Sequence, residues 1–451
     1  MERTIGAPNA QVDALRQALR DRSALIGVIG LGYVGLPLSL AFCAAGGRVL
    51  GLDVDPSKTA AINAGESYIK HIGAEEISTL REAGRFEATD DMRRLAEADA
   101  IVVCVPTPVT KHLEPDLSFV TATAETIARH LRAGQLVVLE STTYPGTTTE
   151  VVRPILERSG LKSGEEFFLA FSPEREDPAN PNHTTASIPK VVGADDAGSL
   201  AAAQAMYEIF VDHVVPVSTA ATAEAVKITE NVFRAVNIAL VNELKTIYSK
   251  MGIDIFEVID AAKTKPFGFM PFYPGPGIGG HCIPVDPFYL TWRAREFGLY
   301  THFVELAGEI NSNMPDQVVS ELAKALDLRF QKGLSGARIL LLGVAYKKNV
   351  DDMRQSPSLE LIEKLEARRA VVDYYDPFIP TIAETRDHPA LSGRMSVEWD
   401  LARFAGYDAV LIATDHDGLD YVGLAEAAQL VIDTRYACAR AGASLDRVVL
   451  A

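Results

Sequence analysis

The most unusual stretch of the chain surrounds Cys282, one of four cysteines. Residues 272–287 read Phe-Tyr-Pro-Gly-Pro-Gly-Ile-Gly-Gly-His-Cys-Ile-Pro-Val-Asp-Pro, a loop whose exposed backbone N–H groups could cradle an anion. Pro284 or Pro287 could begin a helix, and a helix N-terminus favours the thiolate, the nucleophilic form of cysteine. From the residues alone, Cys282 is either a nucleophile or a structural thiol. His281 could be a base or a metal ligand, although a lone loop histidine more often packs or forms hydrogen bonds.

A second candidate group consists of polar residues that recur every three or four positions in a long helical pattern. Glu224, Lys227, Asn231 and Arg234 therefore share one face of a helix expected at about 221–250. These residues form either a solvated charged face or a row of polar groups that points into a cleft between two domains.

A glycine turn forms the third group. Residues 30–35, Gly-Leu-Gly-Tyr-Val-Gly, fit the G-x-G-x-x-G pattern directly after a strand-like run, so Gly30, Gly32, Tyr33, Val34 and Gly35 are candidate cofactor-binding residues. Such a turn places a pyrophosphate at a helix N-terminus, where free N–H groups and the helix dipole favour negative charge.

The residue that ends the next strand indicates which dinucleotide would bind. Asp53 lies 18 residues after Gly35, where a carboxylate can accept hydrogen bonds from the adenosine ribose. An acid at this position would repel the 2′-phosphate of NADP, so NAD is favoured. Lys58 is close enough in sequence to leave NADP open.

Short apolar runs alternate with helical stretches on both sides of the long helix, which is typical of an α/β fold with doubly wound parallel sheets. We expect strands at 25–30, 48–53, 100–105, 136–139 and 167–171, and again at 337–344, 370–375, 409–414 and 430–434. The expected domains are 1–215, with a short amphipathic helix inside an N-terminal extension of 24 residues, a central helical region at 216–318, and 319–451. The long helix can join two domains and pack against a second copy of itself.

The composition excludes several classes of protein. The 451 residues are 48% hydrophobic and 23% charged, which is typical of a globular protein, and the net charge of −17 argues against a nucleic-acid or anionic-membrane binder. By itself this charge also argues against anionic substrates. The cysteines show no paired spacing, so we expect a reduced compartment without disulfides or a zinc site. No signal-peptide pattern is present, and the uncharged stretch 23–47 holds six glycines and a proline, unlike a membrane helix. We expect a cytoplasmic protein.

Seven motifs occur in order along the chain. They are Gly30–Gly35, Val105-Pro-Thr-Pro, Glu140-Ser-Thr-Thr, Ser172-Pro-Glu-Arg, Lys227 with Asn231, Gly279-Gly-His-Cys with Asp286, and Gly343-Val-Ala-Tyr-Lys-Lys. This series resembles the UDP-glucose/UDP-N-acetylhexosamine 6-dehydrogenase family over about residues 25–440. The resemblance implies two Rossmann-like domains joined by a long helix that forms the core of a homodimer. It also implies oxidation of the sugar C6 alcohol to a carboxylate, with two NAD per cycle and no metal.

The resemblance assigns catalytic roles. Cys282 would form a thiohemiacetal with the C6 aldehyde and then a thioester, so that the aldehyde stays bound to the enzyme. Lys227 and Asn231 would stabilise the developing oxyanion. Asp286 would work with Lys227 in proton transfer and water activation, and Glu174 would be the acid or base of thioester hydrolysis.

The resemblance also assigns binding residues. Thr107 and Ser141 would line the NAD site, and Thr142 would hold the water or the nicotinamide. The UDP-sugar would be bound by Arg175, Arg234, Gly275, Gly277, Gly279, Gly280, His281, Lys347 and Arg354, with Lys347 and Arg354 supplied by the second α/β domain.

The sequence around the nucleophile favours one branch of the family and therefore fewer candidate sugar substrates. Gly-Gly-His-Cys-Ile-Pro-Val-Asp-Pro resembles the N-acetylhexosamine branch rather than the UDP-glucose branch, which commonly reads Gly-Gly-Ser-Cys followed by Lys-Asp. Ser-Pro-Glu-Arg-Glu-Asp-Pro and Pro-Gly-Pro-Gly-Ile resemble the UDP-N-acetylglucosamine enzymes more than the UDP-N-acetylmannosamine enzymes. We therefore expect UDP-N-acetylglucosamine, with UDP-N-acetylmannosamine and UDP-glucose as alternatives, and Arg234 as a donor to the acetamido group.

Two other classes stay open at this point. A two-electron β-hydroxyacid-type dehydrogenase shares the glycine turn and a lysine with an asparagine four residues on, but it needs neither Cys282 nor a second α/β domain. A non-catalytic NAD-dependent scaffold or sensor would produce no NADH with any UDP-sugar.

Overall fold

The computed structural model describes residues 10–69, 72–110, 112, 114–175, 185–280, 285–385 and 387–451. His281, Cys282 and Pro284 therefore lie outside the described residues. The chain forms two compact units, one made of Met1–Glu230 with Phe288–Leu299 and the other of Asn231–Pro287 with Tyr300–Ala451. Helix α8 (Ala220–Met251) contributes residues to both units.

The first unit contains an eight-stranded sheet in the order β3-β2-β1-β4-β5-β6-β7-β8. All neighbouring strands are parallel except β6 and β7, which pair antiparallel. The strands are β1 (Leu25–Ile29), β2 (Arg48–Leu52), β3 (Phe86–Thr89), β4 (Ala100–Val103), β5 (Leu136–Leu139), β6 (Phe168–Phe171), β7 (Lys190–Gly193) and β8 (Val214–Val217). The strand order reverses between β1 and β4, and doubly wound sheets bind nucleotides at the carboxyl ends of the strands at such a point.

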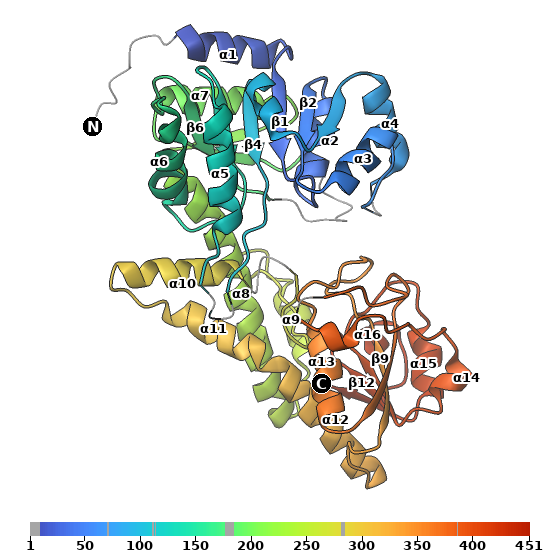
Figure 1. Cartoon of the computed structure of the whole chain (residues 1–451). Helices are drawn as coiled ribbons and strands as arrows, with labels where there is room; N and C mark the ends of the chain where they lie inside the picture. Colours follow the sequence, from blue (N-terminus) through green and yellow to red (C-terminus); the bar gives the residue numbers. More distant parts are fainter. Residues whose placement is uncertain are drawn as a thin grey trace. The chain divides into compact units, whose positions relative to one another are not determined.

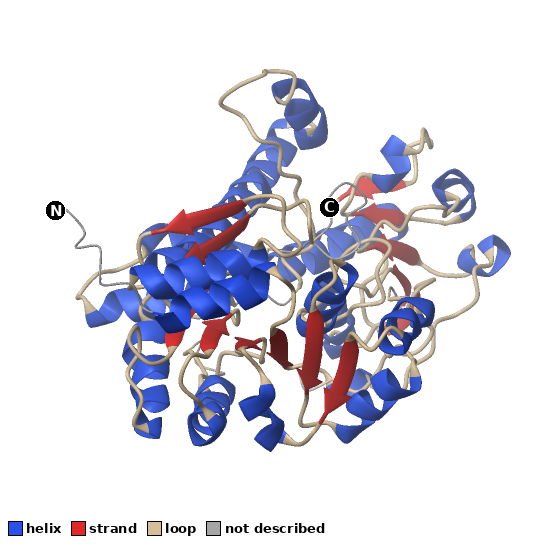
Figure 2. Ribbon diagram, turned by 90° about the horizontal axis from the view of Figure 1, so that it is seen from above, coloured by secondary structure: helices blue, strands red, loops and turns tan. Residues whose placement is uncertain are grey.

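Each of the two sheet faces in this unit carries its own apolar core. Along β4, Ala100 and Val102 belong to one core, and Ile101 and Val103 belong to the other, because successive side chains point to opposite faces. Helices lie on both sides of the strands (Figure 2). Burial on both faces explains why the strands read as continuous apolar runs.

The helices of the first unit include the predicted N-terminal amphipathic helix. It is α1 (Ala10–Arg20), which buries Val12, Leu15 and Leu19 and packs beside α7 (Figure 1). The others are α2 (Gly35–Ala44), α3 (Pro56–Ala64), α4 (Ala74–Glu82), α5 (Ser118–His130), α6 (Arg153–Leu156), α7 (Ala197–Tyr207) and most of α10 (Asp286–Glu296), with short helical segments η1 (Met92–Glu97), η2 (Thr148–Val152) and η3 (Glu157–Ser159).

The second unit contains a smaller, entirely parallel sheet in the order β10-β9-β11-β12-β13. Its strands are β9 (Arg338–Leu342), β10 (Val371–Tyr375), β11 (Ala409–Ile412), β12 (Val431–Asp433) and β13 (Val448–Leu450). Its helices are α9 (Ile255–Ala262), α11 (His302–Ser312), α12 (Met314–Phe330), α13 (Pro357–Ala367), α14 (Leu401–Phe404), α15 (Tyr421–Ala427), α16 (Ala437–Arg440) and the short η4 (Pro389–Leu391). The order reverses at β9, which lies between β10 and β11.

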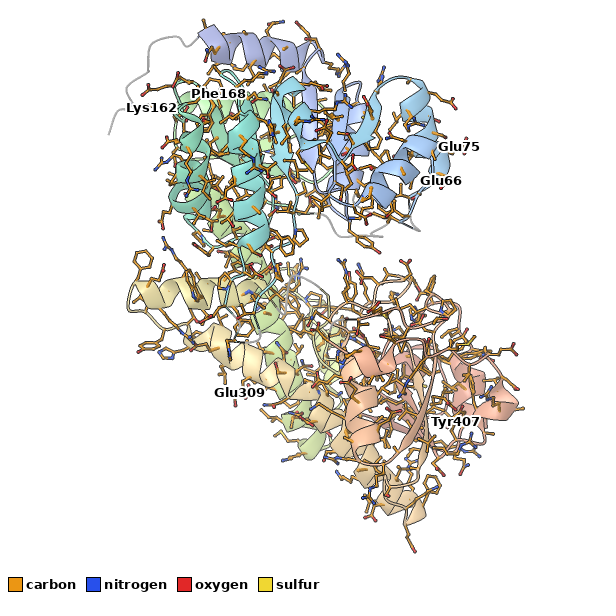
Figure 3. The ribbon with its side chains drawn as sticks, in the orientation of Figure 1. Glu66, Glu75, Lys162, Phe168, Glu309 and Tyr407 are labelled. Carbon is orange, nitrogen blue, oxygen red and sulfur yellow. The ribbon has the colours of Figure 1, made fainter. Side chains whose placement is uncertain are left out.

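Large side chains fill both units. Phe168 of the first unit and Tyr407 of the second are fully buried, whereas Glu75 and Glu309 are exposed (Figure 3). Within the described ranges, no helix is long and apolar enough to cross a membrane.

The predicted fold class is confirmed, since a mostly parallel doubly wound sheet, a second, entirely parallel sheet and the long helix are all present. The strands that we did not predict are β3, β7, β8 and β13. β3 contains an exposed Glu87, and β8 contains Pro216 and is half-exposed, so neither reads as a continuous apolar run. The domain bounds 1–215, 216–318 and 319–451 stay a prediction.

Candidate active site

The glycine turn follows β1 at the point where the strand order of the first sheet reverses. Gly30 has a φ of +93°, and a Cβ on Gly30 would lie 2.5 Å from the Cys104 carbonyl oxygen. A Cβ on Gly35 would lie 1.8 Å from the Gly30 carbonyl oxygen. Both glycines are therefore required by close backbone approach. A Cβ on Gly32, by contrast, would meet no described atom within 4 Å, so this side of the turn is open.

The N-terminus of α2 faces this opening without a side-chain cap, since Val34 at the N-cap position accepts no hydrogen bond from the helix. The first N–H groups of a helix need partners from outside it. An open glycine turn with an uncapped helix N-terminus fits the pyrophosphate of a dinucleotide.

Asp53 is buried at the end of β2 and organises the neighbouring loops. Its Oδ2 accepts from the Leu31 N–H at 2.8 Å and from the Lys58 Nζ at 3.1 Å. Its Oδ1 accepts from the Asp55 N–H at 3.0 Å. The structure therefore brings Lys58 to the predicted ribose-binding carboxylate, where the ammonium partly neutralises the acid.

The residues that follow β4 and β5 lie at the carboxyl ends of these strands, as the glycine turn does at the end of β1. The Ser141 hydroxyl donates to the Val105 carbonyl oxygen at 2.8 Å and so ties its own turn to the Val-Pro-Thr-Pro loop. Thr107 is buried, and its carbonyl oxygen accepts from the Tyr289 hydroxyl of α10 at 2.9 Å. Thr142 is half-buried, and its hydroxyl has no hydrogen-bond partner among the described residues, so it can take a ligand.

Sequence reasoning missed a buried ionic cluster at the carboxyl ends of these strands. Lys190 donates to Glu140 Oε1 at 2.9 Å and lies 4.0 Å from Glu174 Oε2. The Tyr207 hydroxyl also donates to Glu140 Oε1, and the Lys190 ammonium lies over the Tyr207 ring. Because β7 runs antiparallel to β6, its first residue, Lys190, lies where the parallel strands end.

Burial controls the protonation of this cluster. Desolvation raises the pKa of the Glu140 carboxyl, and the Lys190 ammonium opposes that shift. Desolvation raises the pKa of Tyr207, and the nearby Glu140 carboxylate adds to this shift. The phenol therefore stays protonated and serves as the donor in the hydrogen bond to Glu140 Oε1. Glu140 Oε2 is buried without a partner in the described part of the chain. The cluster thus provides a fixed cation beside Glu174.

The first half of the polar stripe on α8 is buried, which excludes a solvated charged face for Glu224 and Lys227. The Lys227 Nζ donates to the Glu174 carbonyl oxygen at 2.6 Å. Glu224 accepts from the Thr148 N–H at 2.8 Å and the Thr148 hydroxyl at 2.7 Å, so it anchors the turn after β5. Glu224 is therefore structural, and Lys227 lies against the segment that carries Glu174.

In the second unit, Asn231 and Asp286 are buried and in direct contact. The Asn231 Nδ2 donates to Asp286 Oδ2 at 2.6 Å. Asp286 is the first residue of α10, four positions after Cys282 in the chain, so the expectation that a proline near Cys282 opens a helix is met by Pro287. The structure therefore joins two of the predicted catalytic residues.

The arginines differ in how far they are already engaged. Arg175 donates to the Pro189 carbonyl oxygen at 2.6 Å and to Glu230 Oε1 at 2.7 Å. Arg234 is exposed and forms no hydrogen bond with the described residues.

The glycine-rich loop packs closely within the second unit. A Cβ on Gly279 would lie 2.8 Å from Tyr346 Cβ, and one on Gly280, at a φ of +90°, would lie 3.0 Å from the Tyr346 ring. The predicted substrate residues Gly279, Gly280 and Lys347 are thus brought together, because Lys347 follows Tyr346.

Sequence reasoning also missed Arg435, which follows β12. Its Nη1 lies 2.4 Å from the position of a Cβ on Gly275, and its Nε donates to the Ala413 carbonyl oxygen at 2.9 Å. The signal available in the sequence was a basic residue just after a predicted strand. A guanidinium against a glycine loop fits a phosphate group. Arg354, in contrast, is exposed and engaged by Asp352 at 2.7 Å.

Three of the four cysteines are described, and two of them are poor nucleophiles. Burial raises the pKa of the Cys43 and Cys438 thiols to about 12, so both stay protonated at neutral pH. Cys104 directly follows the central strand β4 and is half-buried. No group of three or more potential metal ligands occurs in the described ranges.

The open glycine turn and the uncapped N-terminus of α2 are typical of a dinucleotide-binding α/β protein. In the second unit, the Arg435 guanidinium lies against Gly275 of a second glycine loop, residues 275–280. Comparison with known proteins supports this class. Three profiles of the UDP-glucose/GDP-mannose dehydrogenase family match in order, the NAD binding domain at residues 24–211, the central domain at 221–313 and the UDP binding domain at 340–440.

Individual relatives match over most of the chain. The UDP-N-acetyl-D-glucosamine 6-dehydrogenase of Pseudomonas aeruginosa is 36% identical over 419 residues, which cover 91% of this chain and 96% of that protein. The UDP-N-acetyl-D-mannosamine dehydrogenase of Pyrococcus horikoshii is 35% identical over 395 residues, or 87% and 89% of the two chains. The solved UDP-glucose dehydrogenase of Pyrobaculum islandicum superposes with a TM-score of 0.82 at 29% identity and covers 95% and 96% of the two chains.

The chain therefore belongs to the UDP-glucose/GDP-mannose dehydrogenase family. It is an NAD-dependent oxidoreductase that acts on the CH–OH group of a UDP-sugar. The chain matches all three domain profiles of this family. This match decides against the two alternatives, a β-hydroxyacid-type dehydrogenase and a non-catalytic NAD-dependent scaffold or sensor.

Proposed function

We propose that this enzyme oxidises the C6 hydroxyl of UDP-N-acetyl-D-glucosamine to the carboxylate in two steps, with two NAD per cycle and without a metal. The observation that carries the proposal is the buried hydrogen bond from Asn231 Nδ2 to Asp286 Oδ2, which is 2.6 Å long. Asp286 lies four positions after Cys282 in the chain. This contact supplies an oriented amide and a carboxylate.

The first half-reaction produces an aldehyde at C6. Bound NAD would supply the hydride acceptor for each oxidation. The alcohol proton passes to a base on the enzyme, for which Asp286, hydrogen-bonded by Asn231, is the proposed group. The open turn at Gly32 and the Asp53 carboxylate would hold the dinucleotide, and Thr107 and Ser141 would shape the loops beside it.

The second half-reaction requires a covalent intermediate. The Cys282 thiolate adds to the aldehyde carbon, the carbonyl π electrons move to oxygen, and the resulting thiohemiacetal is oxidised to a thioester by loss of a second hydride. Lys227 and Asn231, one helical turn apart on α8, donate to the oxyanion that develops at C6.

Hydrolysis of the thioester releases the product. Water adds to the carbonyl carbon, its proton passes to Glu174, and the C–S bond breaks to return the Cys282 thiolate. The Lys190 ammonium lies 4.0 Å from Glu174 Oε2, so a buried cation stands beside the proposed base. Thr142, with its available hydroxyl, would hold the water or the nicotinamide.

The UDP-sugar would be bound by the second glycine loop. Gly277, Gly279 and Gly280 offer backbone N–H groups, while Lys347, Arg435 and Arg354 offer positive charge. The Gly275 N–H donates to Asn242 Oδ1 at 3.0 Å, so Gly275 contributes the space that the Arg435 side chain occupies. Arg175 and Arg234 are assigned to the sugar, with Arg234 as the proposed donor to the acetamido group. His281, beside the nucleophile, is assigned to the same subsite, and the cytoplasmic location stays a prediction.

The choice of sugar rests on the P. aeruginosa relative, whose name specifies UDP-N-acetyl-D-glucosamine, and on the motifs around Cys282. We expect UDP-N-acetylglucosamine to give the highest kcat/KM in a panel with UDP-N-acetylmannosamine and UDP-glucose, measured by NADH formation. A higher kcat/KM with either competitor would replace the proposed substrate, and no NADH with any of the three would overturn the proposed function.

We also propose a homodimer built on α8. Four apolar side chains at intervals of seven, seven and four residues share one stripe of this helix and are exposed, namely Phe233 at 49%, Leu240 at 49%, Ile247 at 46% and Met251 at 65%. Such a stripe on a long helix is typical of a surface that a second helix covers.

The dimer proposal predicts the effect of a charge on this stripe. We expect Leu240→Arg to weaken the dimer on the order of a hundredfold, because both copies would bury an unpaired cation. Light scattering coupled to gel filtration measures the change. The matched control is Leu328→Arg on α12, since Leu328 is 72% exposed and lies outside the stripe. An unchanged dimer in the Leu240 variant, or a wild-type monomer, contradicts the proposal.

A further inference from the structure

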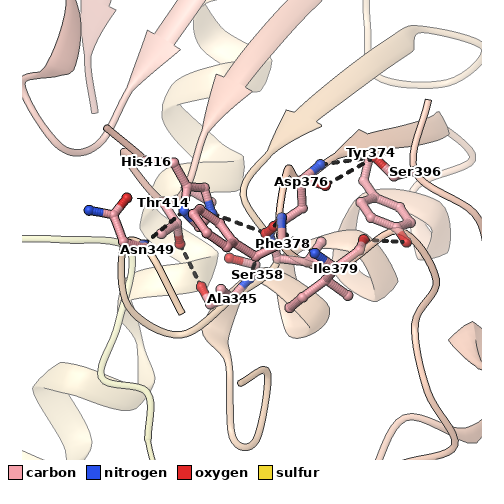
Figure 4. A network of polar contacts seen from close by, with 12 residues as sticks. Ala345, Asn349, Ser358, Tyr374, Asp376, Phe378, Ile379, Ser396, Thr414 and His416 are labelled. Atoms are coloured by element: carbon pink, nitrogen blue, oxygen red, sulfur yellow. Dashed lines mark hydrogen bonds and ion pairs between the residues drawn. The ribbon is translucent and has the colours of Figure 1, made fainter. Parts of the chain in front are cut away.

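A buried acid–histidine pair lies in the second unit at the carboxyl ends of β10 and β11. Asp376 directly follows β10, and His416 follows β11 by four residues. Both side chains are completely buried, and His416 Nε2 lies 3.1 Å from Asp376 Oδ2 (Figure 4). The mechanism proposed above does not use either residue, so their burial calls for a separate explanation.

Asp376 is an acceptor for backbone N–H groups on both of its oxygens. Oδ2 accepts from Val344 at 2.8 Å and Ala345 at 3.0 Å, and Oδ1 accepts from Phe378 at 2.8 Å and Ile379 at 3.0 Å. Burial acts to raise the pKa of this carboxyl, but the hydrogen bond from His416 and the backbone donors outweigh it and lower the pKa. Asp376 is therefore an anion, which can only accept hydrogen bonds.

These contacts define the tautomer of His416. Since Asp376 only accepts, Nε2 of His416 must carry the proton. At the opposite side of the ring, Nδ1 lies 3.0 Å from the backbone N of Asn349, whose N–H donates to it. Nδ1 must therefore be unprotonated, and His416 is a neutral imidazole that connects Asp376 to Asn349.

Asn349 is held at this point in an uncommon conformation. Its φ is +61°, in the left-handed region that asparagine tolerates better than most residues. Its Nδ2 donates to Asp417 Oδ2 at 2.5 Å, and its Oδ1 accepts from the Asp417 N–H at 3.0 Å. Three hydrogen bonds thus attach Asn349 to consecutive residues, His416 and Asp417.

The segment attached in this way carries Lys347. At the start of this segment, the Thr414 hydroxyl donates to the Ala345 carbonyl oxygen at 2.7 Å. Within the segment, the Tyr346 N–H donates to the Asp352 carbonyl oxygen at 3.0 Å. Tyr346 then packs on Gly279 and Gly280 of the substrate loop. A change at Asn349 would therefore move both Lys347 and the support of that loop.

We infer that His416 is a positioning residue for the UDP moiety of the substrate. With Asp376 as its fixed partner, it holds Asn349 and thereby sets the conformation of residues 345–352, which presents Lys347 to the diphosphate. The inference deepens the proposed function and rests on it, since it takes Lys347 as a UDP-binding residue. His416 acts on UDP affinity and leaves NAD binding and hydride transfer unchanged.

Two conservative variants separate the two contacts of the ring. His416→Asn places an amide oxygen near the position of Nδ1 and can still accept from Asn349, whereas His416→Gln places its amide near Nε2 and keeps only the Asp376 contact. We expect the Kd of UDP, measured by calorimetry without NAD, to rise about tenfold in His416→Gln and less than threefold in His416→Asn. Lys347→Met should weaken UDP binding at least as much as His416→Gln does.

Controls distinguish positioning from general loss of structure. NADH affinity and kcat at saturating UDP-sugar should match the wild type in both His416 variants, and His302→Gln, at an exposed histidine on α11, should leave the Kd of UDP unchanged. Equal UDP affinity in His416→Gln and the wild type would overturn the inference, as would equal losses in the Gln and Asn variants. Absence of UDP binding by the wild-type enzyme would instead overturn the proposed function.

Discussion

The Cys282→Ser variant is expected to lose steady-state turnover by on the order of a thousandfold or more. Without a thiolate, the aldehyde formed in the first oxidation cannot become a thiohemiacetal, so the second hydride has no covalent adduct from which to leave. A serine hydroxyl has nearly the same size as the thiol but stays protonated at neutral pH. The first oxidation does not use the thiol, so a pre-steady-state trace should still show NADH at up to one per active site.

The matched control is another cysteine that burial keeps protonated. Cys438 lies in the core of the second unit, where burial raises its thiol pKa to about 12. Cys438→Ala should retain turnover within about threefold, with a loss of stability on the order of 1 kcal/mol. Unimpaired turnover of Cys282→Ser would contradict the thioester route and would favour a two-electron oxidation without a covalent intermediate.

Replacing Lys227 with methionine is the second large effect. The ammonium is buried and held by the Glu174 carbonyl oxygen at 2.6 Å, so its position is fixed before the substrate binds. Removing one preorganised donor to an oxyanion typically lowers kcat by about 10²–10³-fold. We expect a loss of this size in kcat with little change in the KM for the UDP-sugar, because the oxyanion develops only as the reaction proceeds.

Lysine-to-methionine exchange needs its own control. Lys324 on α12 is exposed and forms an ion pair with Glu321 at 3.4 Å, so Lys324→Met should leave kcat unchanged. If Lys227→Met raised KM at constant kcat, Lys227 would bind the ground state of the substrate, and its proposed role at the oxyanion would be wrong.

The sequence was most informative where local rules apply. The glycine turn, the acid after β2 and the long helix all follow from spacing and periodicity. In the structure Gly30 and Gly35 lie where a Cβ would meet backbone atoms, and Asp53 accepts from the Leu31 N–H of the same turn. The contact between Asn231 and Asp286 bridges 55 residues, and no periodicity links the two; only the resemblance suggested that both belong to one site.

Residues that meet through topology could not be found in this way. Lys190 reaches Glu140 and Glu174 because a short strand, β7, runs against the direction of its neighbour, and neither β7 nor its direction was predicted. Asp376 and His416 meet because β10 and β11 flank β9, although 40 residues separate them in the chain. Sequence patterns report local periodicity, whereas strand order is a property of the whole sheet.

The net charge was misleading for a related reason. A value of −17 describes the whole surface, while an anionic ligand responds to the few groups around it. Here those groups are an uncapped helix N-terminus beside Gly32 and, in the second unit, the Arg435 guanidinium beside Gly275. An acidic protein can therefore bind two different pyrophosphates.

The most direct test of the central claim is the number of NADH molecules formed from each molecule of UDP-N-acetylglucosamine when the sugar is limiting and NAD is in excess. The account predicts two NADH per sugar, together with a product that carries a carboxylate at C6. A yield of one NADH per sugar, with the reaction stopping at the aldehyde, would contradict the four-electron oxidation and the role of Cys282.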